Sequence, residues 1–172
     1  MQKLSKLFKV LESEDIDFFY ANLSLMNKSG IYANTNNSSV IILDYSLKKD
    51  KIKRIEVLAE ELGHHFTSVG DYSFSDTYAK KRLNNKCENQ ALKWATEFLI
   101  SEEEICNLVC ENIDVYEMAS KCEVSVNFFL RRLEFLRLQG KELMIGNDIL
   151  VLDNLPYFYL CNKNKLLDNL IV

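Results

Sequence analysis

The sequence predicts an α+β fold that is mostly helical, with a small sheet near the N-terminus. Among its 172 residues there are only five glycines and one proline, which favours few turns and long helices. Apolar runs of strand length lie between residues 16 and 43, whereas helical periodicity dominates after residue 47. Apolar residues make up 48% of the chain and charged residues 27%. This balance is typical of a globular protein and excludes a disordered chain.

The first part of the chain predicts one helix and three strands. Residues 3–13 are predicted to form an amphipathic helix, because apolar side chains recur there at three- and four-residue steps. The predicted strands are residues 16–21, 31–33 and 40–43. Residues 22–30 are polar and end in a glycine, and residues 34–38 are rich in turn formers, so both are predicted to be loops. The sheet is expected to be antiparallel at least in part.

Two long helices are predicted in the middle of the chain, at residues 47–68 and 77–100. The apolar stripe of the first helix consists of Ile52, Ile55, Leu58, Ala59, Leu62 and Phe66. The stripe of the second consists of Ala91, Trp94, Ala95 and Phe98. The polar segment from Gly70 to Asp76 is predicted to be the loop between them. Each stripe is expected to face the core.

Three shorter helices are predicted to follow, each with its own N-cap. Ser101 is followed by Glu104 in a capping box, and the helix it starts covers residues 102–112. Asp114 caps a helix that runs through Cys122. Ser125 caps the last one, which runs through Leu138 and ends before Gly140.

The tail, residues 141–172, is predicted to contain a short hairpin. Residues 143–145 and 149–152 are apolar runs, and residues 146–148 between them form a turn signal. The apolar and aromatic segment 155–160 is interpreted as completing the core. Covering a cleft or binding a partner are the alternatives.

Composition excludes several classes of protein. The formal net charge of −4 argues against a surface devoted to nucleic acid. Five cysteines without framework spacing predict buried thiols rather than a disulfide scaffold. Cys106 and Cys110 are four residues apart and are suited to share a metal ion, but they lack two further partners, so a core role is favoured. No leader-like segment and no apolar run of the roughly 20 residues that a membrane span needs is visible, and a cytoplasmic protein is expected.

The chain has two histidines, His64 and His65, which lie in a cluster of charged residues on a predicted helix. Glu60 and His64 are four residues apart and therefore share a helix face. With Glu61 beside them they form a variant of the H-E-x-x-H pattern, in which the outer residues bind a metal and the inner glutamate is a general base. The alternative is a solvated helix face with a surface Glu–His pair.

A third ligand is predicted on the next helix. Glu88 lies 24 residues after His64, which is enough chain to turn and return along a second helix. Glu88 is predicted to face inward with Ala91, where a carboxylate requires a cation or a metal. His65 points about 100° away from His64 and is expected to flank the site rather than bind the ion.

Residues 57–100, with Leu58-Ala59-Glu60-Glu61-Leu62-Gly63-His64 followed by Glu88-x-x-Ala91, resemble the ImmA/IrrE family of metallo-endopeptidases. The resemblance covers about residues 1–140. It implies a zincin-like peptidase domain at 1–100 and a helix-turn-helix-like region at 101–140, followed by the tail. It further implies Glu60, His64 and Glu88 as metal ligands and Glu61 as the catalytic base. The implied substrate is a helix-turn-helix repressor encoded by a prophage or mobile element.

The chain departs from the usual family pattern. Glu60 replaces a histidine, Gln90 and Leu92 replace acidic and polar residues, and Ile100-Ser101 stands where Met-Pro is common. Two carboxylate ligands would make a divalent centre formally neutral, which weakens its Lewis acidity. The predicted cofactor is Zn²⁺, with Mn²⁺ as the possible substitute.

Two other functions remain open. The chain is alternatively a catalytically weak peptidase-like scaffold that acts as a protein- or DNA-binding regulator of transcription. Residues 115–138 have the pattern of a helix-turn-helix, and the second helix carries Arg131, Arg132 and Arg137. DNA binding is disfavoured by the acidic net charge. No membrane partner is expected, and the oligomeric state is left open.

Overall fold

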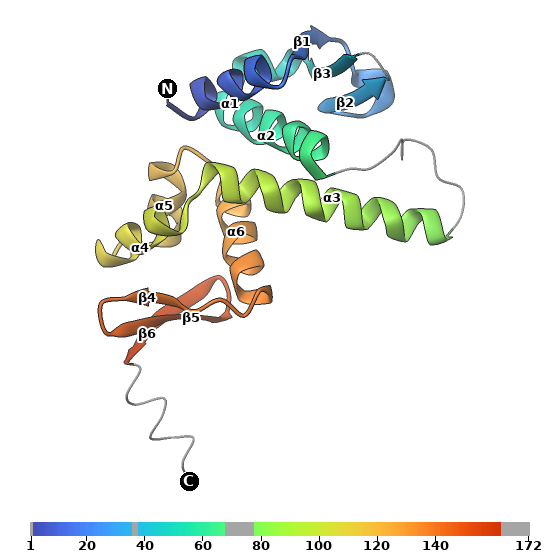
Figure 1. The fold of residues 1–172 in the computed structure, drawn as a ribbon. Helices are drawn as coiled ribbons and strands as arrows, with labels where there is room; N and C mark the ends of the chain where they lie inside the picture. Colours follow the sequence, from blue (N-terminus) through green and yellow to red (C-terminus); the bar gives the residue numbers. More distant parts are fainter. Residues whose placement is uncertain (1, 36–37, 68–77, 163–172) are drawn as a thin grey trace. The chain divides into compact units, whose positions relative to one another are not determined.

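The computed structural model describes residues 2–35, 38–67 and 78–162, with side chains described from residue 85 onward in the last range (Figure 1). The chain divides into two compact units, Met1–Leu99 and Ile100–Val172. Helices predominate, and each unit contains one three-stranded sheet. The predicted α+β class is confirmed. Within these ranges, no helix has both the length and the apolar character needed to cross a membrane.

The sheet of the first unit is mixed, with the strand order β1-β3-β2. Its strands are β1 (Ile16–Ala21), β2 (Gly30–Thr35) and β3 (Ser38–Asp44). β3 pairs with β1 in parallel and with β2 in antiparallel orientation, as expected in part. Ile41 and Leu43 of the central strand are fully buried. The predicted loop 22–30 contains a 3₁₀ turn, η1 (Ser24–Met26), and ends earlier than expected because Gly30 already pairs with Leu43.

Three helices complete the first unit: α1 (Gln2–Ser13), α2 (Lys51–Thr67) and α3 (Tyr78–Leu99). The prediction of one helix over 47–68 is wrong at its start, because a separate 3₁₀ turn, η2 (Tyr45–Lys49), precedes α2. Asp50 separates the two, and its Oδ1 accepts a hydrogen bond from the Lys53 backbone N–H at 3.0 Å. Leu47 lies in this 3₁₀ turn and is buried like the apolar residues of α2. The apolar pattern of the sequence therefore continues from the turn into the helix. Residues 68 and 77, the other predicted boundaries, lie outside the described residues.

α2 and α3 approach each other closely at a glycine. A β-carbon on Gly63 would lie 2.3 Å from the carbonyl oxygen of Ala91 and 2.8 Å from its carbonyl carbon. Leu58 and Leu62 are fully buried, as predicted. Phe66 is 43% exposed, however, so the prediction that it belongs to the buried stripe of α2 is wrong. Phe66 lies beyond the close contact at Gly63, and its ring stacks on Trp94 of α3.

Asp44 fixes the turn after β3. Its carboxylate accepts hydrogen bonds from the backbone N–H groups of Leu23 (2.7 Å) and Ser46 (2.9 Å). A hydrogen bond from the Ser46 side chain, followed by these backbone donors, holds the pKa of Asp44 below its ordinary value of 3.8. These bonds favour the charged form, so the stability they contribute is present above pH 4 and is lost as the pH falls through the lowered pKa.

Asp44→Asn is therefore expected to destabilise the protein at pH 7 and to have a smaller effect at pH 3. The measurement is urea unfolding of both proteins at the two pH values. Asp50→Asn is a suitable control, because Asp50 also accepts a backbone hydrogen bond but does not bridge two segments. A difference between wild type and Asp44→Asn that stays constant from pH 7 to pH 3 would contradict the role given to the charge.

The helices of the second unit begin at the predicted caps. They are α4 (Glu102–Cys110), α5 (Val115–Lys121) and α6 (Val126–Leu138). The side chains of Ser101, Asp114 and Ser125 accept backbone hydrogen bonds from Glu104, Glu117 and Phe128. α4 and α5 each end one or two residues before the predicted position. Gly140 adopts a φ of +63° after α6, which suits a glycine at a helix end.

The second unit ends in an antiparallel sheet with the order β4-β5-β6. The predicted hairpin is present as β4 (Leu143–Ile145) and β5 (Asp148–Asn154), and β6 (Tyr157–Asn162) is a third strand that the sequence analysis missed. Tyr157 and Tyr159 are 76% and 60% exposed. The interpretation that this segment completes the core is wrong for these side chains, because β6 pairs only with β5 and lies at the edge of the sheet.

The cysteines are all free thiols, but not all are buried as predicted. Cys87 and Cys122 are buried, whereas Cys110 is exposed. On the short helix α4, Ile105 and Leu108 occupy the inward positions, so Cys110 is turned to the surface.

Candidate active site

The candidate site lies in the first unit, where α2 crosses α3. Glu60, Glu61 and His64 lie within two turns of α2, and Glu88 belongs to α3. His64 Nε2 and Glu88 Oε2 are 3.4 Å apart. The close contact at Gly63 brings the two helices near enough for this pair. The structure therefore places Glu88 against His64, 24 residues away in the chain.

Glu88 does not face inward as the sequence analysis predicted. Its side chain is 61% exposed, whereas that of His64 is 17% exposed. Cys87 and Ala91 occupy the buried positions of this part of α3. Glu88 follows Cys87 and is turned by about 100°, so it reaches His64 from the rim of the site.

Glu61 is the most strongly perturbed acid of the cluster. Burial raises its pKa from 4.5 to about 7 against the opposing effect of the His64 charge. Part of this burial comes from Gly30 of β2, because a β-carbon there would lie only 2.5 Å from Glu61 Oε1. The sequence analysis placed Gly30 in a loop and missed this contact. The available signal was a glycine just before an apolar run, which marks a close approach of the backbone.

The other three members form a coupled set of charges. Burial raises the pKa of Glu60, and repulsion from Glu88 adds to it. The hydrogen bond from His64 lowers the pKa of Glu88 against the effect of burial. Burial alone would lower the pKa of His64, but the hydrogen bond to Glu88 and the surrounding carboxylates outweigh it and raise that pKa. The contact with Glu88 therefore favours the imidazolium form of His64, and the contact with His64 favours the carboxylate form of Glu88.

Glu60, His64 and Glu88 have the types of donor atom that bind a divalent metal ion. Zinc accepts histidine nitrogen and carboxylate oxygen, and catalytic zinc sites have three protein ligands, the number that Glu60, His64 and Glu88 would supply. In the part of the chain that the structure describes, no group of three or more His, Cys, Asp or Glu side chains is arranged to hold a metal. A metal bound to His64 and Glu88 would compete with a proton for the same atoms. Glu60, one helical turn before His64, would contribute a carboxylate ligand.

His65 turns away from this cluster, as predicted. Its Nδ1 lies 3.0 Å from the hydroxyl of Tyr32, and its Nε2 lies 3.5 Å from the carboxylate of Glu14. His65 thereby connects α2 with β2 and with the end of α1. Both of its ring nitrogens have partners in the fold, which supports a flanking role.

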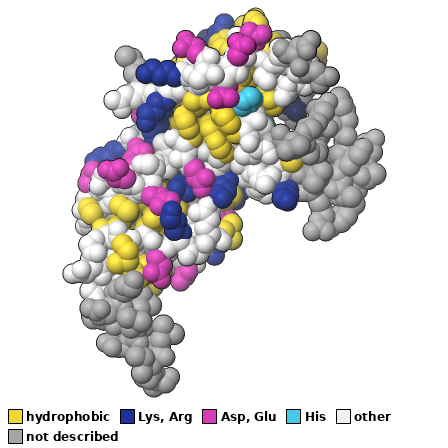
Figure 2. Space-filling view, viewed as in Figure 1, with side chains coloured by type: hydrophobic (Ala, Val, Ile, Leu, Met, Phe, Trp, Pro, Cys, Tyr) yellow, Lys and Arg dark blue, Asp and Glu magenta, His cyan; other side chains and the backbone are white. Residues whose placement is uncertain are grey.

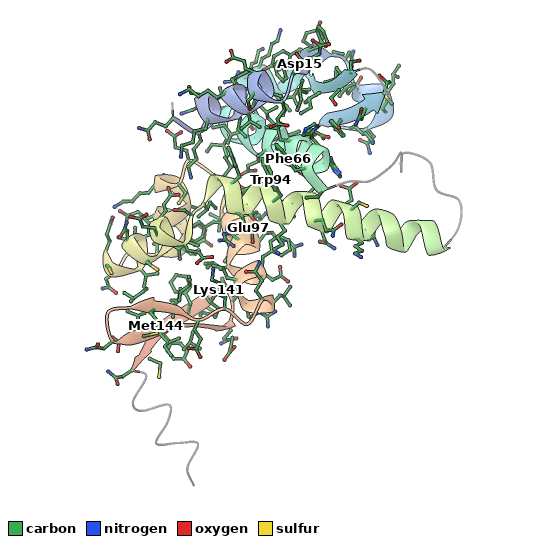
Figure 3. The ribbon with its side chains drawn as sticks, in the orientation of Figure 1. Asp15, Phe66, Trp94, Glu97, Lys141 and Met144 are labelled. Carbon is green, nitrogen blue, oxygen red and sulfur yellow. The ribbon has the colours of Figure 1, made fainter. Side chains whose placement is uncertain are left out.

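An aromatic stack continues on the same side of α2 as His65. The ring of Phe66 stacks on Trp94 with centroids 4.8 Å apart, and Trp94 stacks on Phe98 at 4.9 Å. Figure 3 shows Phe66 of α2 and Trp94 of α3 pointing toward each other. The stack joins the two helices that carry the candidate site.

The arginines of the helix-turn-helix-like region are mostly used within the second unit. Arg132 is 3% exposed, and its Nε donates a hydrogen bond to the carbonyl of Ile100 at 3.0 Å. Arg131 forms an ion pair with Glu134. On the face seen in Figure 2, acidic and basic side chains are interspersed. Arg131 and Arg132 thus both have partners within α6 or beside it.

Comparison with protein families gives one match. Residues 11–134 match the family model of the IrrE N-terminal-like domain, Peptidase_M78. The match includes α2, α3 and all four residues of the candidate site. It also extends beyond the first unit into α6. Searches of curated proteins and of solved structures gave no match.

Proposed function

Because the chain belongs to the family of the IrrE N-terminal-like domain, a peptidase family, we propose that it is a zinc-dependent endopeptidase. Glu60, His64 and Glu88 are the proposed metal ligands, and Glu61 is the proposed general base. The observation that carries this proposal is the contact of His64 with Glu88 across two helices, beside the half-buried Glu61, whose pKa is raised. Acids whose pKa is strongly raised by burial beside a charged partner are frequent in catalytic sites.

The proposed residues divide the chemistry of peptide hydrolysis between them. A zinc ion held there would polarise the scissile carbonyl and acidify a water molecule. Glu61 accepts the proton of the attacking water and later delivers it to the leaving amine. A pKa near 7 suits this exchange, because such a group gains and loses a proton readily at neutral pH. Gly30 limits the access of bulk water to Glu61 from the side of β2.

The proposed substrate is a helix-turn-helix repressor of a prophage or mobile element. The resemblance to the ImmA/IrrE family supports this substrate. The carboxylate-rich ligand set supports slow, selective cleavage, because a formally neutral centre polarises a carbonyl less strongly. It also supports activity with Mn²⁺, which prefers oxygen ligands more than zinc does.

Zinc affinity tests the ligand set. We expect His64→Ala and Glu88→Ala each to weaken zinc binding by at least about 100-fold, since loss of outer-shell partners alone costs 10–100-fold. We expect Glu60→Ala to do the same. The measurement is competition with a chelating dye, on the metal-free full chain.

Glu97→Ala is the matched control for these variants. Glu97 also lies on α3, more than two turns after Glu88, and it forms an ion pair with Lys93. Its removal should leave zinc affinity unchanged. Wild type that binds no zinc would overturn the proposal and leave the peptidase-like scaffold as the better description. Unchanged affinity in Glu60→Ala alone would remove Glu60 from the ligand set.

A further inference from the structure

The turns that follow β1 and β3 lie together at one edge of the first sheet. β1 and β3 run in parallel, and their last residues, Ala21 and Asp44, are paired. η1 follows β1, and η2 follows β3. The Leu23 backbone N–H donates a hydrogen bond to the Asp44 carboxylate at 2.7 Å, which ties the two turns together. α2 begins two residues after η2 ends, at Lys51, so its N-terminal end belongs to the same edge.

η1 holds two apolar side chains outside the core. Leu25 is 99% exposed and Met26 is also exposed, and we call this pair the apolar tip. The backbone of the turn is fixed on both sides. Before it, the Leu23 side chain is buried, and after it the Asn27 N–H donates to the Ser24 carbonyl at 3.1 Å. An anchored turn that presents two neighbouring apolar side chains suits contact with an apolar medium.

Residues 48–54 carry five cations and only one carboxylate, on a chain whose formal net charge is −4. Four of these cations are exposed lysines, which we call the basic cluster: Lys48, Lys49, Lys51 and Lys53. The carboxylate of Asp50 accepts a hydrogen bond from the Lys53 backbone N–H at 3.0 Å. A local positive surface on an acidic protein favours a negatively charged partner.

Cation–π contacts join the basic cluster to the end of β1. Lys48 Nζ lies 4.7 Å from the ring centroid of Tyr20 in β1 and 4.8 Å from that of Tyr45 in η2. Tyr20 precedes Ala21, from which the chain continues toward η1. Tyr45 is itself exposed, and a tyrosine ring suits a boundary between water and hydrocarbon. The basic cluster and the apolar tip therefore belong to one surface of the first unit.

An anionic phospholipid bilayer offers both kinds of contact that this surface can make. Its acyl region accepts apolar side chains, and its acidic headgroups attract lysines. A nucleic acid also attracts lysines, but its phosphate backbone gives the apolar tip no apolar environment. We propose that this surface binds an anionic phospholipid bilayer, with Leu25 and Met26 inserted at the interface and the basic cluster on the headgroups.

This binding is peripheral and separate from the candidate active site. The sequence predicts no membrane partner because no apolar run of spanning length is visible, but peripheral binding requires only a few inserted side chains and a basic patch. Lys53 and His64 are 11 residues apart on α2, or about 16 Å by helical rise. The proposal therefore does not depend on the proposed peptidase activity.

Co-sedimentation of the full chain with vesicles tests the proposal. The probe is vesicles of equal parts of phosphatidylcholine and phosphatidylserine, compared with vesicles of phosphatidylcholine alone. We expect wild type to bind the anionic vesicles more tightly by about 10-fold or more at low salt, because each lysine near an anionic surface contributes about five-fold in affinity. The preference should decrease as the salt concentration rises.

Leu25→Ser tests the apolar tip. We expect it to weaken binding to the anionic vesicles by about 10-fold or more, because the leucine side chain is no longer transferred out of water. Leu25 is almost fully exposed, so urea unfolding should show the stability of wild type and exclude a folding defect. Leu138→Ser is the matched control, because Leu138 is an exposed leucine of the second unit. It should bind as wild type does.

Lys53→Gln tests the basic cluster and should weaken binding to the anionic vesicles by about five-fold. Adding Lys49→Gln should increase the loss to about 25-fold. Lys86→Gln is the matched control, because Lys86 is an exposed lysine two residues before Glu88, which contacts His64 rather than the start of α2. Its affinity should stay within about two-fold of wild type, since charges beyond a Debye length are screened.

Several results would overturn the bilayer proposal. They are equal binding to neutral and anionic vesicles, wild-type affinity in Leu25→Ser, and equal losses in the two control variants. A single-stranded oligonucleotide is the competing probe. If the protein binds it through Lys53 without Leu25 and does not bind the vesicles, the surface is a nucleic-acid site instead. Vesicle binding by a protein that binds no zinc would support this inference while the proposed function fails.

Discussion

Replacing Glu61 by glutamine is expected to reduce peptide hydrolysis by about 10²–10⁴-fold while zinc affinity changes little. Glutamine has nearly the same shape, but its amide cannot accept and return a proton at neutral pH. The measurement is the appearance of new N-termini in a proteome-derived peptide library, detected by mass spectrometry. Zinc competition on the same preparation shows that the metal site is intact.

Glu97→Gln is the control, because it removes a carboxylate from α3 outside the site. It should cleave the library as wild type does. If Glu61→Gln cleaves as fast as wild type, Glu61 is not the base. A loss of both cleavage and zinc affinity would instead place Glu61 among the ligands.

The same substitution should stabilise the metal-free protein at alkaline pH. Burial raises the pKa of Glu61 from 4.5 to about 7. The folded state therefore binds more protons than the unfolded state between these values, and wild-type stability falls as the pH rises through them. Glutamine does not titrate. We expect Glu61→Gln to be more stable than wild type by up to about 3 kcal/mol at pH 8, with little difference at pH 4.

Gly63→Ala is expected to destabilise the protein by about 1–3 kcal/mol and to weaken zinc binding. Helix propensity alone predicts the opposite, because alanine in a helix is favoured over glycine by about 1 kcal/mol. The added methyl group would meet the Ala91 carbonyl oxygen at 2.3 Å, so α3 must move away from α2. Glu88 moves with it and away from His64. Urea unfolding measures the stability, and dye competition measures the zinc affinity.

A double substitution identifies the cause of this effect. The atoms that Gly63 meets are the backbone of Ala91, which glycine would retain. Ala91→Gly is therefore expected not to rescue Gly63→Ala. A rescue would show that the side chain of Ala91 makes the critical contact. Stabilisation by Gly63→Ala would contradict the close approach of the two helices.

The features that the sequence predicted well depend on local interactions. Ser101, Asp114 and Ser125 cap their helices through hydrogen bonds to residues three positions ahead, so a short window of sequence contains the whole signal. His64 and Glu88 were expected together for another reason, namely the 24 residues of chain between them and the family resemblance. The His64–Glu88 contact itself is present, although the metal-binding role remains a prediction.

The features that the sequence did not predict depend on contacts between distant segments. Gly30 covers Glu61 because β2 lies beside α2. A glycine just before an apolar run signals a close approach of the backbone, but it does not identify the neighbour. Glu88 lies on the rim rather than inside, because Cys87 and Ala91 compete successfully for the buried positions.

The mixed pairing of the first sheet has a consequence for the order of folding. β2 and β3 form a hairpin in which Thr35 pairs with Ser38, whereas β1 pairs Ile16 with Ser39, far along the chain. Closing the longer loop costs more chain entropy, so the hairpin is expected to form before β1 joins it. The loop that joins β1 to β2 closes only when β1 has joined. A partly folded or nascent chain would therefore contain the β2–β3 hairpin before it contains the complete first sheet.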